Sequence, residues 1–365
     1  MEYRKLAFKK EIFTAAPDAK LLKVAKDGIM PEELYLTTNH PTYIKYQGTW
    51  KLAKDQMMDS CIVLENGEFF VREYWHIKQG SLIVAGLKED GSEGIFVHED
   101  GFLPEENFKK DFSSFAFMSS HVSREYPIPY IGIVNELLKH KDSGYIIWVL
   151  GPAVTHSRGR KDMAWLIDNN FVNVLFGGNA VATHDLEAAI LGTTLGMDSL
   201  GRTVPGGHRH HDDTINKIRS LESMEKAVEA GVVKDGIMCS CIRKNVPYVL
   251  AGSIRDNGPI PGVITDTFMA QDVMREHTKR ATLVVMVATV LHSIATGNML
   301  PTFYESGDTL KPLNVICVDQ DEFNLNKLRD RGTHQSISVA TNAQDFLRIV
   351  VNELKGLHEK TTYST

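Results

Sequence analysis

The 365-residue chain has few cysteines, no excess of basic charge and no long hydrophobic run. Its four cysteines, Cys61, Cys239, Cys241 and Cys317, form neither a CxxC pair nor a zinc knuckle, so we expect free thiols. The net charge of -6 offers no positive field to a phosphate backbone, which argues against nucleic-acid binding. The apolar stretch 281–295 is too short and interrupted to cross a bilayer, and we see no secretory signal. We therefore predict a cytoplasmic protein without membrane partners.

The first hundred residues favour short strands, and a chain of this length is expected to form about two domains. Turn formers at Asn66-Gly67 and Asp90-Gly91 separate the runs, which is typical of antiparallel hairpins. The expected strands are 43–46, 61–64, 68–75, 81–84 and 94–97. A charged segment, 99–112, follows them, so we predict a β-rich N-terminal domain over residues 1–112.

From residue 113 to 365 the pattern changes to strand, turn and helix. Apolar runs rich in Val, Ile and Leu end at glycines or polar residues, as strands buried on both faces do. The expected strands are 145–150, 172–176, 248–251, 283–288, 315–318 and 336–339. Amphipathic stretches at 163–168, 222–230, 321–331 and 343–354 lie between or after them. This alternation predicts an α/β, Rossmann-like domain with a parallel, doubly wound sheet, which binds ligands beyond the carboxyl ends of its strands.

Dinucleotide binding is favoured by residues at the strand ends, although the chain lacks a GxGxxG fingerprint. Asp319, at the tip of the expected strand 315–318, could accept both ribose hydroxyls of an adenosine, or it could cap the next helix. A carboxylate there would repel a 2′-phosphate, which favours NAD. The segments 177–180 (GGNA) and 297–300 (GNML) could bring backbone close to a pyrophosphate, or be ordinary turns. Asp266 could bind a ribose or cap the helix after it.

A second dense constellation is 206–213 (GGHRHHDD), where His208, His210 and His211 accompany two aspartates. These residues could ligate a metal, transfer protons near neutral pH, or occupy the surface. Because no known metal-ligand spacing occurs there, we predict no metal site. Arg124 and Arg255 each lie in a polar loop, as a carboxylate-binding arginine would.

Six ordered motifs resemble the conserved-domain family named after lysine-oxoglutarate reductase/saccharopine dehydrogenase (LOR/SDH). They are FMSSHVSRE (117–125), GPAVTH (151–156), GNAVATHD (178–185), GGHRHH (206–211), YVLAGSIRD (248–256) and LHSIATGNMLP (291–301). That family includes the archaeal-type, NAD-dependent ornithine cyclodeaminases and the cyclodeaminase half of cyanobacterial arginine-degrading enzymes. No arginine-dihydrolase module precedes these motifs, so arginine hydrolysis is not expected.

The resemblance implies a deoxyhypusine-synthase-like NAD-binding fold, a homo-oligomer and a defined cofactor cradle. The cradle residues it implies are Asn179, Ala180, Asp266, Asn298, Met299, Leu300, Pro301, Asp319, Asn342 and Ala343.

The implied reaction converts L-ornithine to L-proline and ammonia by transient hydride transfer to NAD. In that reaction Arg124 or Arg255 would hold the substrate carboxylate, and His208, His210 or His211 would move protons. Asp256 would orient a histidine or meet the δ-ammonium group. The alternatives are an NAD-dependent dehydrogenase or lyase of another basic amino acid, and a non-catalytic NAD-binding regulatory module.

Overall fold

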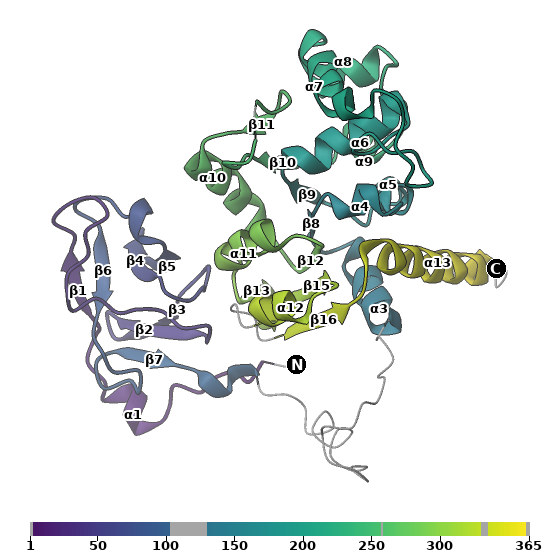
Figure 1. Cartoon of the computed structure of the whole chain (residues 1–365). Coiled ribbons are helices and arrows are strands. Elements are labelled where there is room, and N and C mark those ends of the chain that lie inside the picture. The colour runs from purple at the N-terminus through teal and green to yellow at the C-terminus, as the bar shows by residue number, and fades with distance from the viewer. Residues whose placement is uncertain (1–2, 103–129, 257, 330–334, 363–365) are drawn as a thin grey trace. The chain divides into compact units, whose positions relative to one another are not determined.

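The computed structural model describes residues 3–102, 130–256, 258–329 and 335–362 (Figure 1). The chain divides into two compact units. The first contains residues 1–126, 298–313 and 332–335, and the second contains the remainder. The segment 298–313 thus returns the chain to the first unit. The predicted boundary near residue 112 lies outside the described residues.

The first unit is built from antiparallel sheets. One sheet has the strand order β1-β6-β4-β5, a second has the order β3-β2-β7, and a third is the hairpin β13-β14. The bounds are β1 Lys20–Lys23, β2 Thr42–Tyr46, β3 Thr49–Leu52, β4 Cys61–Glu65, β5 Glu68–Arg72, β6 Leu82–Ala85, β7 Ile95–Val97, β13 Phe303–Ser306 and β14 Thr309–Pro312. A short helix, α1 (Glu11–Thr14), and the 3₁₀ turns η1 (Tyr74–His76) and η2 (Glu99–Phe102) complete the described elements. Ile44, Ile62 and Phe69 are fully buried between the strands, and the predicted β-rich region is confirmed.

The second unit contains a seven-stranded sheet in the order β11-β10-β9-β8-β12-β15-β16. Its strands are β8 Ile146–Leu150, β9 Val174–Gly177, β10 Tyr248–Ala251, β11 Val263–Ile264, β12 Leu283–Val287, β15 Asn314–Asp319 and β16 Gln335–Ala340. Every residue of β8 and β12 is buried, as strands covered on both faces require. Trp148 on β8 pairs in parallel register with Leu175 and Val285 on its two neighbours. The predicted doubly wound sheet is confirmed.

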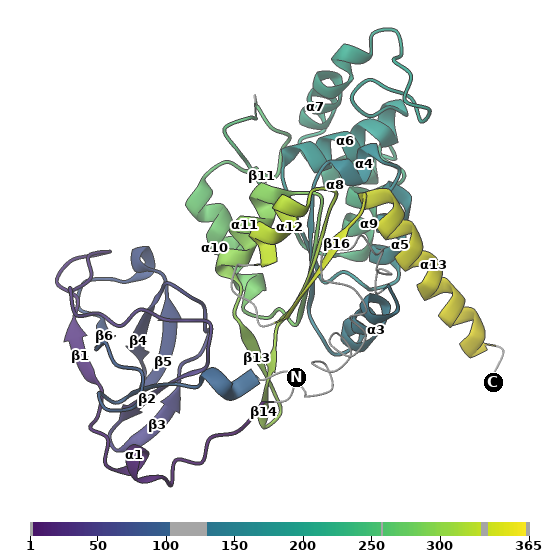
Figure 2. The ribbon, with the colours of Figure 1, turned by 60° about the horizontal axis from the view of Figure 1, so that its bottom comes forward.

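Helices cover both faces of this sheet. Figures 1 and 2 show α10, α11 and α12 on one side, and α3, α4, α5, α9 and α13 on the other. Their bounds are α3 Tyr130–Lys141, α4 Ala153–His156, α5 Arg160–Asp168, α6 Asn179–Leu191, α7 His210–Ser220, α8 Met224–Glu229, α9 Ile237–Lys244, α10 Thr267–Thr278, α11 Val290–Met299, α12 Glu322–Arg329 and α13 Ala343–Thr362, with the 3₁₀ turn η3 (Gly207–Arg209) before α7. Trp148, Phe171 and Phe346 are fully buried and belong to one hydrophobic core. Within the described residues, no helix combines the length and the apolar character that a membrane span needs.

A buried ion pair fixes helix α6 against its neighbours. Asp185 is fully buried and accepts hydrogen bonds from Arg160 Nε (2.6 Å) and from the backbone N–H groups of Ile237 (2.9 Å) and Met238 (2.8 Å). Burial raises the pKa of Asp185, while Arg160 and the two amides oppose that rise. The carboxylate thereby caps α9 and ties it to α6, whose first turn lines the cavity described below.

Helix α3 is joined to the start of β15 by Glu136, and this junction predicts an acid-sensitive stability. Glu136 lies 3.4 Å from His140 Nε2 and accepts a 2.5 Å hydrogen bond from Asn314 Nδ2. The hydrogen bond with His140 is the largest cause that lowers the pKa of Glu136 to about 2, with Lys139 and Asn314 adding to it. The folded carboxyl group therefore binds a proton less readily than the unfolded one, which has the ordinary glutamate pKa of 4.5.

The resulting stability is present above pH 4.5 and is lost as the pH falls towards 2. We expect the free energy of unfolding of the wild type to fall by about 1 kcal/mol more than that of Glu136→Gln between about pH 5 and about pH 3, a figure reduced for partial exposure. Urea unfolding at each pH measures this difference. Parallel pH profiles for the two proteins would contradict the assignment.

Candidate functional site

The strand order of the second unit reverses at β8. The chain passes from β8 through β9 and β10 to β11 on one side, then returns to place β12, β15 and β16 on the other. The backbones are very close at this point: Gly151 N–H donates to Val287 O (2.9 Å), and a Cβ on Gly151 would lie 1.8 Å from Ala288 O. Ala288 itself has a left-handed φ of 53°. Open α/β sheets bind ligands beyond such a switch point.

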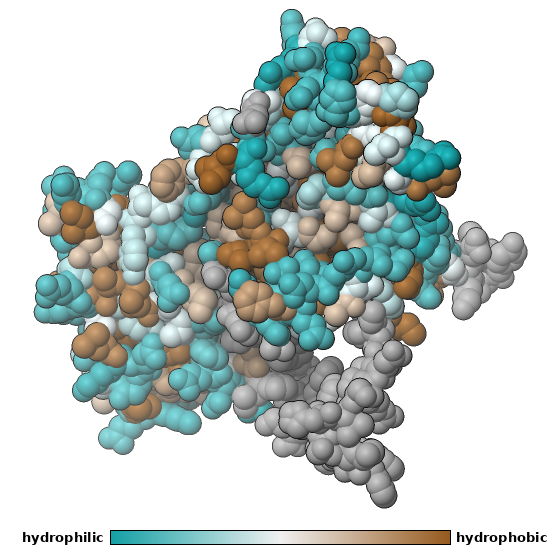
Figure 3. All heavy atoms as spheres, viewed as in Figure 1, coloured by the Kyte–Doolittle hydropathy of each residue, from teal (hydrophilic) through white to brown (hydrophobic). Residues whose placement is uncertain are grey.

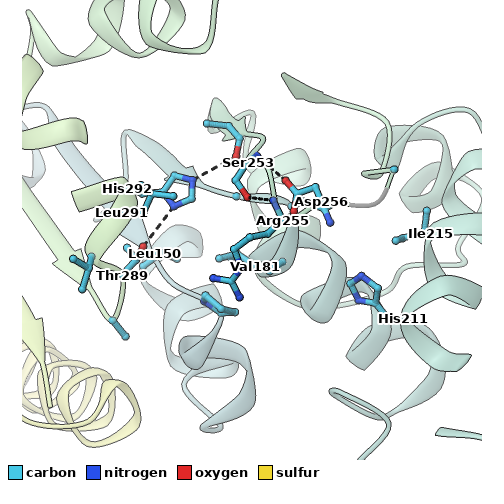
Figure 4. Close-up of a pocket in the computed structure, with 18 of the residues that line it drawn as sticks. Leu150, Val181, His211, Ile215, Ser253, Arg255, Asp256, Thr289, Leu291 and His292 are labelled. Atoms are coloured by element: carbon cyan, nitrogen blue, oxygen red, sulfur yellow. Dashed lines mark hydrogen bonds between the residues drawn. The ribbon is translucent and has the colours of Figure 1, made fainter. Parts of the chain in front are cut away.

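A cavity of about 650 Å³ lies at this edge of the sheet. Its walls come from the ends of β8, β10 and β12, the start of α6 and the start of α7. Figure 4 shows Leu150, Thr289 and His292 on one side and His211 and Ile215 on the other, with the loop 253–256 between them. The volume lies in the range of small-molecule and cofactor sites.

One wall of the cavity is the amino-terminal end of α6. Its N-cap residue, Gly178, is extended (φ -116°, ψ -179°) and provides no side-chain cap, and Asn179, Ala180 and Val181 of the first turn line the cavity. The side chain of Asn179 is engaged elsewhere, since its Oδ1 accepts from Thr183 Oγ1 and Ile260 N, both at 3.1 Å. The first N–H groups of the helix therefore have no side-chain acceptor at the N-cap, and the helix dipole favours an anion there.

The glycine at this position keeps the space open. A Cβ added to Gly178 would lie 2.9 Å from Cε1 and 3.2 Å from Nε2 of His292, and 3.5 Å from Ala251 O. The backbone can therefore approach a bound group closely only because residue 178 has no side chain. The uncapped helix and this open backbone fit the diphosphate of a dinucleotide.

His292, on α11, brings an imidazole to the opposite wall. Its Nε2 lies 3.4 Å from Ala251 O and its Nδ1 lies 3.5 Å from Thr289 Oγ1. Desolvation lowers the pKa of His292, although Ala251 O and the charge of Asp256 act in the other direction. The ring is consequently neutral near pH 7 and is able to accept a proton.

The loop after β10 supplies the cavity's opposite charges. Asp256 Oδ2 accepts from Ser253 N (2.8 Å), and Arg255 N donates to Ser253 Oγ (3.2 Å), so the loop closes on itself. The guanidinium of Arg255 is exposed and, among the described residues, has no ion-pair partner. It is available to bind an anionic group of a ligand.

The structure brings together five of the predicted site residues, Asn179, Ala180, His211, Arg255 and Asp256, which all line the cavity. Two predicted proton-transfer residues lie elsewhere. His208 is exposed, and His210 Nδ1 is 2.7 Å from Thr193 Oγ1. Arg124 lies outside the described residues.

Asp319 is located at the carboxyl end of β15, as predicted, but it does not cap α12. That role belongs to Asp321, whose Oδ1 accepts from Phe323 N (2.9 Å). Asp319 Oδ1 accepts from Asp321 N (3.0 Å) and Asn324 Nδ2 (3.3 Å), and among the described residues its Oδ2 has no donor. One carboxylate oxygen therefore remains available to a ribose.

Two other predicted cofactor residues are helix caps in this structure. Asp266 Oδ1 accepts from Met269 N (2.8 Å) at the start of α10. Asn342 Oδ1 accepts from Asp345 N (2.8 Å) at the start of α13, where Ala343 is the buried first residue. The cap engages one carboxylate oxygen of Asp266, whereas Asn342 also donates from Nδ2 to Asp345 Oδ2 (2.6 Å).

The predicted segment 298–301 lies at and after the end of α11. Met299, Leu300 and Pro301 are buried, and Asn298 is exposed. None of the four lines the cavity, and the contacts of this segment group it with the first unit.

His292 was missed in the sequence. It follows the buried run 283–287 by five positions, as Asn179 closely follows β9, so the same rule about strand ends could have found it. The pair His184 and Glu187, which faces His211 from α6, was missed as well. The sequence signal that could have found this pair is its three-residue spacing, which places both side chains on one face of a helix.

The doubly wound sheet, with a cavity at its switch point and an uncapped helix beside it, defines an open α/β protein of the Rossmann type. A family model described as arginine dihydrolase ArgZ-like, C-terminal, Rossmann fold matches residues 132–350, and one for the first C-terminal region matches residues 41–131. The chain belongs to this ArgZ-like C-terminal family.

Curated archaeal relatives are similar over most of the chain. The ornithine cyclodeaminase of Methanopyrus kandleri is 44% identical and that of Archaeoglobus fulgidus 40%, each over 347 residues that cover 94% of this chain and 80% of the relative. Among solved structures, an LOR/SDH protein from Methanococcus maripaludis is 36% identical with a TM-score of 0.81, covering 94% of this chain and 99% of that one. The ternary complex of AgrE with ornithine and NAD+ is 32% identical with a TM-score of 0.59, covering 94% and 47%.

Proposed function

We propose that this protein is an NAD-dependent ornithine cyclodeaminase that converts L-ornithine to L-proline and ammonia. Its archaeal relatives carry that name, and AgrE has been crystallised with ornithine and NAD+. The observation that carries the proposal is the cavity, where an uncapped helix end, an arginine without an ion-pair partner among the described residues and a neutral histidine meet. These are the groups that a cofactor diphosphate, an amino-acid carboxylate and an amine require.

NAD, when bound, supplies an acceptor that takes the α-hydrogen of the substrate as hydride and later returns it. The residues that would hold it are the first turn of α6 for the diphosphate and Asp319 for an adenosine ribose. A negative Asp319 disfavours the 2′-phosphate of NADP. The other predicted cradle residues, including Asn298 and Asn342, remain predictions.

Arg255 would bind the substrate carboxylate through its exposed guanidinium. Asp256, the adjacent residue, would attract the substrate's δ-ammonium group, with one of its carboxylate oxygens held by Ser253 N. Arg255 and Asp256 are neighbours of opposite charge, as binding of the carboxylate and the δ-ammonium group of a basic amino acid would require. Arg124 remains a predicted second candidate for the carboxylate.

Ring closure requires an amine that has lost its proton, because an ammonium group has no lone pair. Neutral His292 would accept that proton and return it to the leaving ammonia. His211 is the only one of the three predicted proton-transfer histidines that lines the cavity, and it faces His292 from the other wall (Figure 4).

Apolar side chains form part of the cavity lining. Leu150, Val181 and Ile215 line its interior, and Leu291 lies at its rim with 62% of its surface exposed. Hydrophobic side chains gather on the surface over α10 and α11 (Figure 3). A dry site would protect the transferred hydride and strengthen the contacts of Arg255 and Asp256.

Residues 113–365 would provide the NAD-binding catalytic domain in this proposal, and the β-rich domain over 1–112 would shape substrate entry or a subunit contact. We further propose that the protein is a cytoplasmic homo-oligomer. Its substrate would be a small amino acid, and it would act in proline biosynthesis.

The test combines cofactor dependence with an isotopic label. We expect L-ornithine to give proline and ammonia in equal amounts, only when NAD+ is present and without accumulation of NADH. With deuterium at the α-carbon of ornithine, we expect a slowed reaction and proline that keeps the deuterium, because the hydride leaves and returns to the substrate.

Other outcomes separate the alternatives. NADH formed in proportion to ornithine, without proline, would indicate a dehydrogenase. Turnover of lysine but not of ornithine would change the substrate. A folded, NAD-binding protein that turns over neither amino acid would contradict the proposal and favour a regulatory module.

A further inference from the structure

A compact cluster of potential metal ligands lies behind the cavity wall formed by His211. His184 and Glu187 project from one face of α6 at positions i and i+3, and His211 is the second residue of α7. One ligand atom from each of the three residues lies within 4.8 Å of the other two. His184 and Glu187 are buried, and His211 is partly buried.

The spacing suits a small divalent ion. Zinc binds imidazole nitrogen at about 2.0–2.1 Å and carboxylate oxygen at about 2.0–2.2 Å, so tetrahedral ligand atoms lie roughly 3.3–3.5 Å apart. His184 Nδ1 and Glu187 Oε2 are already 3.0 Å apart. The ligand atoms all lie within 4.8 Å of one another, so a change in the side-chain rotamer of His211 that moves its ring nitrogen by about 1.5 Å would reach the tetrahedral spacing.

Buried nitrogens in this cluster have no protein partner. Among the described residues, Nδ1 of His211 and Nδ1 of His156 are buried without a hydrogen bond. The ring of His184 lies between them, with its centroid 5.0 Å from that of His211 and 4.5 Å from that of His156. Buried polar atoms in native proteins are nearly always satisfied, so such nitrogens indicate a bound water or ion.

The carboxylate of Glu187 is held by a loop built around it. Oε1 accepts from Thr193 Oγ1 (2.9 Å) and Gly196 N (2.9 Å), and Oε2 accepts from Leu195 N (3.1 Å). Leu195 has a left-handed φ of 53°, which is costly for a residue with a Cβ.

Gly196, the next residue in that loop, has φ 67° and is in such close contact with Gly207 that a Cβ would lie 2.2 Å from Gly207 O. In metal sites, donors that hydrogen-bond to a ligating carboxylate in this way fix its orientation towards the ion.

We propose that His184, Glu187 and His211 bind one divalent transition-metal ion of the zinc class, which replaces the proton shared by His184 Nδ1 and Glu187 Oε2. Water would occupy the fourth position of a tetrahedral ion. The ion would join α6 to α7 and fix His211 at the cavity wall. The inference does not depend on the proposed activity, and it revises the prediction that the histidine-rich segment holds no metal.

The experiment uses the full chain, stripped with a chelator and titrated with Zn²⁺ and with Co²⁺. We expect one ion per chain by calorimetry and elemental analysis, visible absorption bands of four-coordinate Co²⁺ that Zn²⁺ abolishes, and a melting temperature roughly 5 °C higher at a hundredfold excess over the dissociation constant. Each readout is independent of turnover.

Variants separate this site from accidental binding. His211→Gln is expected to abolish the Co²⁺ bands, and Thr193→Val to weaken binding by about tenfold through loss of one donor to Glu187. The control is His208→Gln, three residues before His211 on the exposed surface, which should bind as the wild type does. Absence of a stoichiometric ion in the folded wild type would overturn the proposal. Equal binding by folded His211→Gln would do the same, and if that variant does not fold, the Co²⁺ spectrum of the wild type decides.

Discussion

Gly178→Val is expected to lower the affinity for NAD+ by roughly 100-fold, about 3 kcal/mol, while the protein remains folded. The new Cβ would lie 2.9 Å from the ring of His292, and the branched methyl groups would cover the first N–H groups of α6. Gly178→Ala should cause a smaller loss, about tenfold, because the histidine ring can move by a few tenths of an ångström. Fluorescence or calorimetric titration with NAD+ measures both.

A matched control exists in the same unit. Gly356→Ala places a methyl group where no atom lies within 4 Å, on helix α13 away from the cavity. Its NAD+ affinity should equal that of the wild type. If Gly178→Val bound NAD+ normally, the diphosphate would have to lie elsewhere, and the α6 end would lose its assigned role.

Arg255→Met should raise the KM for ornithine by roughly 30–100-fold with little change in kcat. A charge-assisted hydrogen bond to a carboxylate contributes about 1.5–3 kcal/mol, and the carboxylate does not change during the reaction, so the loss falls on binding. Arg255→Lys should recover part of the affinity, because lysine keeps the charge but loses the two-pronged geometry. Steady-state kinetics at saturating NAD+ distinguish these effects.

Arg243→Met provides the comparison for this experiment. Arg243 is an exposed arginine on α9 that does not line the cavity, and its removal should leave KM unchanged. An unchanged KM in Arg255→Met would transfer carboxylate binding to another cation, of which Arg124 is the predicted candidate.

The fold was largely predictable because its signals are local. Strands buried on both faces need continuous apolar runs, and the runs at 146–150, 283–287 and 315–318 could be found without knowledge of their partners. Strand β1, with its sequence KLLK, and the two-residue β11 were not predicted. Neither has a continuous or alternating pattern, and both are strands only because a neighbour pairs with them.

The site was predictable in part, for a related reason. Residues within a few positions of the strand ends, such as Asn179 and Arg255, share an edge of the sheet by topology alone. The sequence could not tell which of His208, His210 and His211 lines the cavity. In the structure His208 is exposed to solvent, His210 contacts Thr193, and His211 lines the cavity. That choice depends on where η3 ends and α7 begins. The approach of His184 and Glu187 to His211 depends in turn on how α6 packs beside α7.

The central position of β8 has a consequence for how the chain is made. Its partner β12 is encoded far downstream: Tyr145 and Thr282, which bond at the start of the two strands, are 137 residues apart. During synthesis, one edge of the wholly apolar β8 stays without its neighbour until β12 has left the ribosome. Contacts between such distant residues also close slowly. The second unit should therefore refold slowly and rely on chaperones more than a protein of its size with local contacts.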